Sequence, residues 1–253
     1  LVLPLQLQNA SAAAESKRLT YKFDGFSSAA INEFAFNGDA AVPAGMNVIR
    51  LTPAVALQSG AVFHKTPLNL QNNYSFSTVF SFKMSGSNPT DGISDGLTFT
   101  IQTGTASQRA NGGGIGYYGI NPGFTVKYDT FYNNVYSDPS ANYIGIAQNG
   151  DPVNQSGRYT DLNSFNATNG TNYVLSNGTL YYTWIDYDGL NKNVQVRLGT
   201  SPDRSASSKV LEVNNIDLGA IFNGSPVHAG FTASTGLPNY ENHDIYSWYF
   251  VDD

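Results

Sequence analysis

Hydrophobic and polar residues alternate with a period of two along most of this chain, and this alternation restricts the fold more than any other feature of the sequence. In the segment 76–84, every second residue is apolar or threonine, and the residues between them are serine, valine and lysine. The segments 97–101 and 124–128 repeat the pattern. Because successive side chains of a strand point to opposite faces of a sheet, the alternation predicts β-strands that bury one face.

The pattern continues through the rest of the chain and predicts one all-β domain over residues 1–253. Connections rich in Gly, Asn, Pro and Ser separate the expected strands, and we find no amphipathic helix of useful length, internal repeat or linker between two cores. We therefore expect a single antiparallel β-sandwich. Its N-terminal strand or extension is expected over residues 1–17, where Leu1 to Leu7 alternate with other residues. Further strands are expected near residues 180–184, 194–198, 227–233 and 245–251.

The low charge content and acidic balance of the chain exclude several classes of partner. Charged residues make up 13% of the chain and the net charge is −6, with no cluster of Lys or Arg. We therefore expect neither nucleic acid nor an anionic membrane surface as a partner. No segment reaches transmembrane length, so no membrane insertion is expected. The absence of cysteine excludes disulfides and thiolate metal sites.

The polar surface must come from Ser, Thr, Asn and Gln, a composition common in secreted β proteins, and we expect a secreted or cell-surface protein. Several Asn-x-Ser/Thr triplets would be glycan acceptors in a eukaryotic secreted protein. A chain rich in Asn and Thr also produces such triplets by chance, so both interpretations stay open. Triplets of this kind begin, among other positions, at Asn73, Asn154, Asn166, Asn169 and Asn177.

A group of oxygen-bearing side chains follows the strand-like segment 124–129. Asp129, Asn133 and Asp138 lie within ten residues, and Ca²⁺ takes carboxylate, amide and backbone carbonyl oxygens in a flexible shell. Such loops are also common as solvated turns, because Asp and Asn favour turn geometry. Asp95 opens another strand-like segment, and a lone carboxylate with aromatic and Asn neighbours suits a sugar. Together these features predict a carbohydrate site that is organised by calcium.

The order of short motifs from residue 18 to residue 251 resembles the legume-type (L-type) lectin family. Any single motif is common, whereas the ordered set is specific. The motifs lie at residues 37–40, 50–52, 60–64, 67, 76–82, 95–97, 112–116, 126–133, 138–139, 144–146, 230–236 and 243–250. The resemblance implies a concanavalin-like jelly roll and a non-catalytic protein that binds glycans or glycoproteins.

The resemblance also implies a role for each residue of the site. One calcium ion would be bound by Asp129, the backbone carbonyl of Phe131, Asn133 and Asp138. Asp95, held by a cis peptide bond to the preceding serine, would accept hydrogen bonds from two adjacent sugar hydroxyls. The remaining sugar contacts would come from the N–H of Gly113 or of its neighbour Gly114, the amide of Asn133, the ring of Phe131, and the loop residues Leu237, Asn239 and Tyr240.

Two positions depart from the plant members of the family, which bind a transition metal beside the calcium. Those members have a Glu two residues before the bridging Asp and a His after the Asp-Pro pair, where this chain has Lys127 and Tyr143. Because a charged lysine cannot ligate a cation, we expect the transition-metal site to be lost and the Lys127 ammonium to neutralise Asp129 instead. The Lys-x-Asp-Thr pattern is most similar to the bacterial surface-adhesin branch of the family.

Catalysis is an alternative to sugar binding, because related sandwiches include glycoside hydrolases. Such enzymes need two carboxylates about 5 to 10 Å apart, and in the sandwich enzymes these typically lie on one strand as Glu-x-Asp-x-Glu. Glutamate is scarce in this chain, and Lys127 occupies the strand position where an acid would be needed. His64, His228 and His243 have no metal-like spacing and are expected to be structural. We therefore expect no enzyme activity.

The most favoured function is a glycan-recognition module for cell-surface adhesion. The alternative from another class is a structural or protein-binding sandwich that has kept the lectin fold and lost sugar recognition. The sequence leaves the sugar and the oligomeric state open, with a homodimer among the alternatives.

Overall fold

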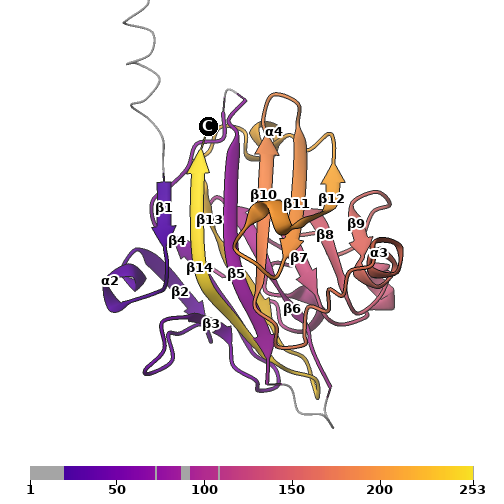
Figure 1. The fold of residues 1–253 in the computed structure, drawn as a ribbon. Helices are drawn as coiled ribbons and strands as arrows, with labels where there is room; N and C mark the ends of the chain where they lie inside the picture. Colours follow the sequence, from indigo (N-terminus) through magenta and orange to yellow (C-terminus); the bar gives the residue numbers. More distant parts are fainter. Residues whose placement is uncertain (1–19, 72, 87–91, 108, 253) are drawn as a thin grey trace, which may run out of the picture.

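Two antiparallel β-sheets stacked face to face make up most of the structure (Figure 1). The computed structural model describes residues 20–71, 73–86, 92–107 and 109–252. The N-terminal strand that was predicted over residues 1–17 lies outside the described residues. The predicted antiparallel β-sandwich is confirmed, and its strands lie where the alternation of the sequence places them.

We call the sheet that contains β14 and β5 the back sheet and the sheet that contains β13 and β6 the front sheet; in Figure 1 the back sheet lies nearer the viewer. The back sheet runs β1 (Thr20–Phe23), β14 (Asn242–Asp252), β5 (Phe76–Ser85), β10 (Tyr181–Asp188), β11 (Asn193–Gly199) and β12 (Ser208–Val213), and β3 (Ile49–Thr52) also pairs with β14. The front sheet runs β2 (Phe34–Gly38), β4 (Ser59–His64), β13 (His228–Ser234), β6 (Gly96–Gln102), β7 (Gly123–Asp129), β8 (Tyr143–Gln148) and β9 (Tyr159–Asp161).

Helices are short and lie in the connections between strands. The longest among the described residues, α3, begins after Asp161, whose side chain accepts the N–H of Asn163, and ends at Gly170 in the left-handed conformation. No helix in the described part of the chain is long and apolar enough to cross a membrane. The helices are α2 (Ser28–Ile31), α3 (Leu162–Asn169) and α4 (Leu218–Phe222), with 3-10 turns η2 (Gly112–Gly114), η3 (Asn134–Tyr136) and η4 (Arg204–Ala206).

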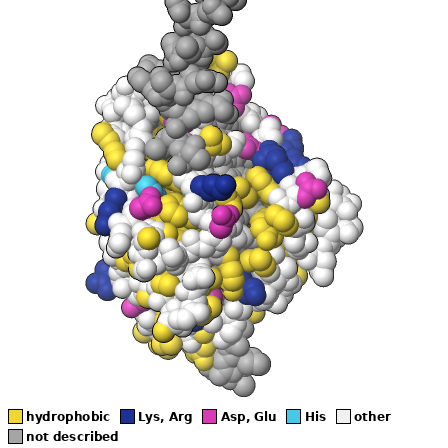
Figure 2. All heavy atoms as spheres, turned by 60° about the vertical axis from the view of Figure 1, so that its left-hand side comes forward, with side chains coloured by type: hydrophobic (Ala, Val, Ile, Leu, Met, Phe, Trp, Pro, Cys, Tyr) yellow, Lys and Arg dark blue, Asp and Glu magenta, His cyan; other side chains and the backbone are white. Residues whose placement is uncertain are grey.

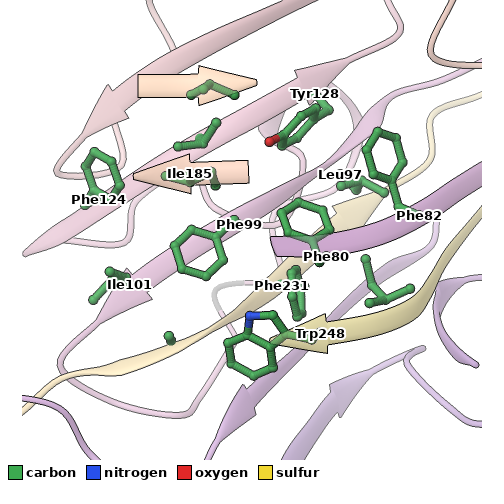
Figure 3. Close-up of a cluster of buried hydrophobic side chains, with 14 of the residues drawn as sticks. Phe80, Phe82, Leu97, Phe99, Ile101, Phe124, Tyr128, Ile185, Phe231 and Trp248 are labelled. Atoms are coloured by element: carbon green, nitrogen blue, oxygen red, sulfur yellow. The ribbon is translucent and has the colours of Figure 1, made fainter. Parts of the chain in front are cut away.

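Aromatic side chains from both sheets fill the space between them (Figure 3). The ring centre of Phe231 in the front sheet lies 4.9 Å from that of Phe80 and 5.0 Å from that of Trp248, which both belong to the back sheet. Such edge-to-face pairs contribute about 0.5–1.5 kcal/mol each beyond the burial of apolar area. The indole Nε1 of Trp248 donates to the hydroxyl of Thr78 at 2.8 Å. The core therefore joins the sheets through packed rings, and the polar atom of Trp248 is paired.

The register of the front sheet gathers loops at one end of the sandwich. Gly96, the first residue of β6, pairs with Asp129 at the end of β7 and with Ser234 at the end of β13. A Cβ at position 96 would lie 2.2 Å from a backbone carbonyl oxygen of β7, so only glycine allows the strands to approach this closely. Asp95, just before β6, and Thr130, just after β7, consequently lie side by side at this end of the sheet.

The surface of the molecule carries few charges. Figure 2 shows one face, on which the visible basic and acidic side chains are scattered among uncharged and hydrophobic ones. The described part of this face has no broad basic surface of the kind that nucleic-acid binding needs.

Candidate functional site

Asp95 lies immediately before β6, and its backbone is held on two sides. The peptide bond between Ser94 and Asp95 is cis, which confirms the prediction from the family resemblance. The N–H of Asp95 donates to the carbonyl of Ser234 at 2.9 Å, and its carbonyl accepts the N–H of Thr130 at 2.9 Å. The ends of β7 and β13 therefore fix the position of Asp95.

The carboxylate of Asp95 has an acceptor atom that the described residues leave unused. The residue is 3% exposed, and its Oδ2 has no hydrogen-bond partner in the described part of the chain. Burial raises the pKa of Asp95 to about 7, against the opposing effects of the Ser94 hydroxyl and of His243. A buried acceptor without a donor is unfavourable unless a ligand supplies one. This site therefore suits a ligand that brings hydroxyl donors.

The glycine run of η2 lies against Asn133. A Cβ at position 113 would lie 2.7 Å from Oδ1 of Asn133, so Gly113 leaves room for that side chain where a larger residue would not. The N–H of Gly114 donates to the carbonyl of Asn111 at 3.3 Å, so this N–H is already engaged in its own turn. Of the two glycines predicted to face a sugar, Gly113 is the one that meets Asn133.

The predicted specificity loop approaches Asp95 through its backbone. The carbonyl of Asn239 accepts the hydroxyl of Ser94 at 2.6 Å, and the N–H of Tyr240 donates to a backbone carbonyl in the segment before Asp95 at 3.3 Å. Leu237 is 71% exposed at the tip of this loop. The loop therefore lies beside Asp95 with an apolar side chain open to solvent.

Asp129 and Asp138, at the two ends of one loop, are both buried, with exposures of 2% and 6%. Oδ1 of Asp129 accepts the N–H of Phe131 at 3.0 Å, and Oδ2 of Asp138 accepts the N–H of Asn133 at 2.7 Å. Burial raises the pKa of both carboxyls, and the charge of Asp138 raises the pKa of Asp129 further. Two acids buried together are unfavourable in their charged forms without a compensating cation.

Tyr143 connects the two acids. Its hydroxyl oxygen lies 2.9 Å from Oδ2 of Asp129 and 2.6 Å from Oδ1 of Asp138. Asn154 adds a second donor, because its Nδ2 lies 2.8 Å from Oδ1 of Asp138 and 3.0 Å from the Tyr143 hydroxyl. A phenol has one hydrogen to donate, so both contacts of Tyr143 are favourable only when one carboxyl holds a proton. This agrees with the raised pKa values of the acids.

Lys127 is buried beside these residues but bonds elsewhere. Its ammonium donates to the carbonyl of Pro152 at 3.1 Å and lies 5.2 Å from the centre of the Tyr143 ring. Burial lowers the pKa of Lys127, and the charges of Asp129 and Asp138 oppose this effect. Lys127 thus compensates the acids from a distance, because among the described residues its hydrogen bond goes to a backbone carbonyl rather than to Asp129.

The donor set of this loop fits a calcium ion. Asp129 and Asp138 would supply carboxylates and Phe131 a backbone carbonyl, and Oδ1 of Asn133 is buried without a hydrogen-bond partner in the described part of the chain. The described residues contain no group of three or more His, Cys, Asp or Glu that could hold a metal ion. An ion bound here would therefore need amide and carbonyl oxygens as well as carboxylates, a mixture that Ca²⁺ accepts.

Asn154 is the member of this cluster that sequence reasoning missed. It lies in the connection between β8 and β9, and only the folding of that connection over β7 brings it to Asp138. The one signal at this position was an Asn-x-Ser triplet, which predicts a glycan acceptor. In the structure the same amide nitrogen makes two partly buried contacts with the acid cluster.

Comparison with known proteins identifies the family. The profile of the legume lectin domain matches residues 18–253. The chain is 27% identical over 256 residues to the 2-acetamido-2-deoxy-D-galactose-binding seed lectin 2 of Cytisus scoparius, covering 93% of this chain and 96% of that protein. It is also 30% identical over 244 residues to the L-type lectin-domain containing receptor kinase VIII.1 of Arabidopsis thaliana, covering 91% of this chain and 32% of the kinase.

Solved structures support the same assignment. A basic winged bean lectin with Tn-antigen matches with a TM-score of 0.74 and 25% identity, covering 94% of this chain and 99% of that one. Peanut lectin with a nine-residue peptide matches in fold with a TM-score of 0.77, covering 94% and 98% of the two chains. The predicted jelly-roll sandwich is thereby confirmed. The similarity to the bacterial surface-adhesin branch stays a prediction, because the relatives named here are plant proteins. The chain belongs to the legume lectin family, whose members are non-catalytic carbohydrate-binding proteins.

Proposed function

We propose that this protein is a calcium-dependent lectin that recognises glycans through Asp95. The observation that carries the proposal is the unpartnered, buried Oδ2 of Asp95 at the end of the front sheet. Sugar hydroxyls are donors that this acceptor lacks. The side chain is held in place before any ligand arrives, and such preorganisation lowers the entropic loss on binding.

The other sugar contacts proposed here surround Asp95. Gly113 would offer its N–H, Asn133 its amide N–H, and the half-buried ring of Phe131 a flat surface for the apolar face of the sugar. The loop with Leu237, Asn239 and Tyr240, next to Ser94, would decide which sugars fit. The name of the Cytisus scoparius relative makes N-acetylgalactosamine a reasonable first ligand to test.

One calcium ion would be held by Asp129, the carbonyl of Phe131, Asn133 and Asp138. Its charge would neutralise the two buried acids and fix the loop between them. Asn133 would then use its oxygen for the ion and its amide N–H for the sugar. Asp129 and Asp138 already accept N–H donors from this loop, so the chain itself holds the loop close to its binding shape.

The protein would bind no transition metal beside the calcium. The space around the acid pair is occupied by hydrogen-bond donors of Lys127, Tyr143 and Asn154. None of these three side chains would be a metal ligand while it donates in this way. The hydroxyl of Tyr143 and the amide of Asn154 would stabilise the outer side of Asp138 by hydrogen bonds. Lys127 would add a positive charge.

The protein would act outside the cell, as the recognition module of a larger adhesin or as a secreted lectin. Shallow sugar sites bind weakly, so several copies on one surface would raise the avidity. A homodimer is one way to achieve this, and the oligomeric state can be measured directly by light scattering.

The test is a glycan array probed in calcium and in EGTA with wild type, Asp95→Asn and Asp188→Asn. Asp188 is the last residue of β10, and its carboxylate accepts backbone N–H groups of the turn that leads to β11. Binding that needs calcium, is lost in Asp95→Asn and persists in Asp188→Asn would support the proposal. A blank array with a folded wild-type protein would favour a structural or protein-binding sandwich, and calcium-independent binding would exclude the role of the ion.

A further inference from the structure

A buried pair, Glu241 and His243, lies behind the proposed sugar site. Both residues are 0% exposed. Oε1 of Glu241 accepts the hydroxyl of Thr130 at 2.7 Å and lies 3.3 Å from Nε2 of His243. Nδ1 of His243 lies 2.6 Å from the hydroxyl of Thr52 in β3. The pair therefore connects the back sheet to the loop that follows β7.

Thr130 links the proposed calcium ligands to Asp95 of the proposed sugar site. It stands between Asp129 and Phe131, two of the proposed calcium ligands, and its N–H donates to the carbonyl of Asp95. In contrast to its backbone N–H, the side-chain hydroxyl of Thr130 bonds to Glu241. The residue is 4% exposed. The hydroxyl of Thr130 therefore has no access to solvent that would replace Glu241 as its acceptor.

Burying this pair is unfavourable by itself. A carboxylate taken into a hydrophobic interior loses its hydration and must be compensated by hydrogen bonds or charge. Oε2 of Glu241 and Nε2 of His243 have no hydrogen-bond partner among the described residues, so the compensation is incomplete. An aliphatic residue would fill the same space more favourably, which indicates that the carboxylate has a task that packing does not explain.

We propose that Glu241 is a positioning residue, which fixes Thr130 and thereby sets Asp129 and Phe131 against Asp95, while the ring of His243 lies beside the Glu241 carboxylate. The inference rests on the proposed function, because the geometry that Glu241 fixes is that of the proposed calcium and sugar site. Outer residues that orient metal ligands typically change metal affinity about 10–100-fold when they are mutated. The structure thus extends the site to a residue that touches neither ligand.

The test compares variants that keep or remove the hydrogen bond. Thr130→Val and Glu241→Met remove the donor and the acceptor, whereas Thr130→Ser and Glu241→Gln retain them. The control is Thr78→Val, which makes the same change at another buried residue, 2% exposed. The hydroxyl of Thr78 pairs with Trp248 in the core. Thr78 lies toward the end of β5 opposite to Met84, which pairs with His243. Calcium affinity is measured by titration calorimetry, and mobility of residues 130–136 by amide hydrogen exchange without any ligand.

We expect Thr130→Val and Glu241→Met to weaken calcium binding at least about tenfold and to speed exchange in residues 130–136. Thr130→Ser and Glu241→Gln should stay close to wild type, and the double variant Thr130→Val/Glu241→Met should be no worse than either single one. Thr78→Val should lower the melting temperature and leave affinity and local exchange unchanged.

Two outcomes would overturn the inference. In one, Thr130→Val lowers the melting temperature as Thr78→Val does, with no change in loop exchange or calcium affinity. In the other, Thr130→Ser fails to restore the behaviour of wild type. If Glu241→Met does not fold, the pair Thr130→Val and Thr130→Ser decides the question alone. A wild-type protein without calcium or glycan binding would refute the proposed function instead, and the exchange data would still decide whether Glu241 positions the loop.

Discussion

The hydroxyl of Tyr143 lies 2.6 Å from the carboxylate of Asp138, at the position where plant members of the family are expected to carry a metal-binding His. The same hydroxyl lies 2.9 Å from Asp129. One neutral side chain therefore contacts both acids of the proposed calcium site. Hydrogen bonds from Tyr143 thus occupy this side of the cluster, and the proposed calcium ion would make their contribution to stability depend on calcium.

Tyr143→Phe should destabilise the protein more in chelator than in calcium. Without the hydroxyl, the buried acids lose a donor, and an unsatisfied buried polar group costs about 1–3 kcal/mol. Calcium would compensate part of this loss by neutralising the acids. Urea denaturation with and without calcium measures the difference.

The matched control is Tyr187→Phe. The hydroxyl of Tyr187 accepts the N–H of Leu218 in the back-sheet region, away from the acid cluster. Its removal should lower the free energy of unfolding equally in both conditions. Equal losses for Tyr143→Phe with and without calcium would contradict the proposed link between Tyr143 and the ion.

The strands were predictable because their signal is local. In β5, Phe76, Thr78, Phe80, Phe82 and Met84 are all buried between the sheets, as the alternation of the sequence requires. A period-two pattern fixes which face is buried without any knowledge of the partner strand. The order of strands in each sheet is not local, and the alternation did not predict it; the family resemblance supplied only the jelly-roll class.

The site was predictable in part. Gly113 lies against Asn133, and Asp95 and Gly112 both bond to residues at the end of β13, whereas Asn154 and Glu241 were missed. Both missed residues come from connections whose approach to β7 is decided by tertiary packing. The alternating pattern says nothing about such connections, and neither residue stands at a spacing that points to the acid pair. His243 was expected to be structural, and its contact with Thr52 agrees with this expectation.

Wild-type protein is expected to bind one equivalent of calcium and no manganese or zinc. The reason is that Lys127 and Tyr143 leave the outer side of the acid pair without ligands. The double variant Lys127→Glu/Tyr143→His should gain a second metal site, because carboxylate and imidazole are ligands for such metals. Metal content after dialysis, measured by mass spectrometry, gives both stoichiometries.

Lys127→Met/Tyr143→Phe is the control for this experiment. It removes the same two polar groups and adds no ligand, so it should bind no transition metal. Manganese or zinc in the wild-type protein, held at the acid pair, would refute the predicted loss of the second site.

The contribution of the buried acids to stability in chelator should fall as the pH rises from about 4 to about 7. The pKa of Asp95 rises from 3.8 to about 7 on folding, and those of Asp129 and Asp138 also rise. In this range the folded state keeps protons that the unfolded state releases, so each step up in pH favours unfolding. For Asp95 the effect is on the order of a few kcal/mol at pH 7. Calcium should remove the part due to Asp129 and Asp138, because it binds their charged forms.

Denaturant melts at several pH values, with EGTA and with millimolar calcium, test this expectation. Asp95→Asn should flatten the slope in EGTA, because the amide does not titrate, and Asp188→Asn should not. A wild-type slope in EGTA that equals the slope of Asp95→Asn over this range would contradict the assignment of Asp95 as a buried, proton-holding acid.

Gly113→Ala should abolish sugar binding while the protein stays folded. A Cβ at this position would lie 2.7 Å from Oδ1 and 2.9 Å from Nδ2 of Asn133, so Asn133 must move away from both the proposed ion and the proposed sugar. A misplacement of about 1 Å in a binding group can reduce activity about a hundredfold. Gly104→Ala is the control, because the nearest atom to a Cβ at that position is 4.0 Å away. Titration calorimetry with the best ligand from the array should give no detectable heat for Gly113→Ala and a wild-type affinity for Gly104→Ala. Full binding by Gly113→Ala would mean that Asn133 does not need its present position, and the sugar site would have to be sought elsewhere on the sandwich.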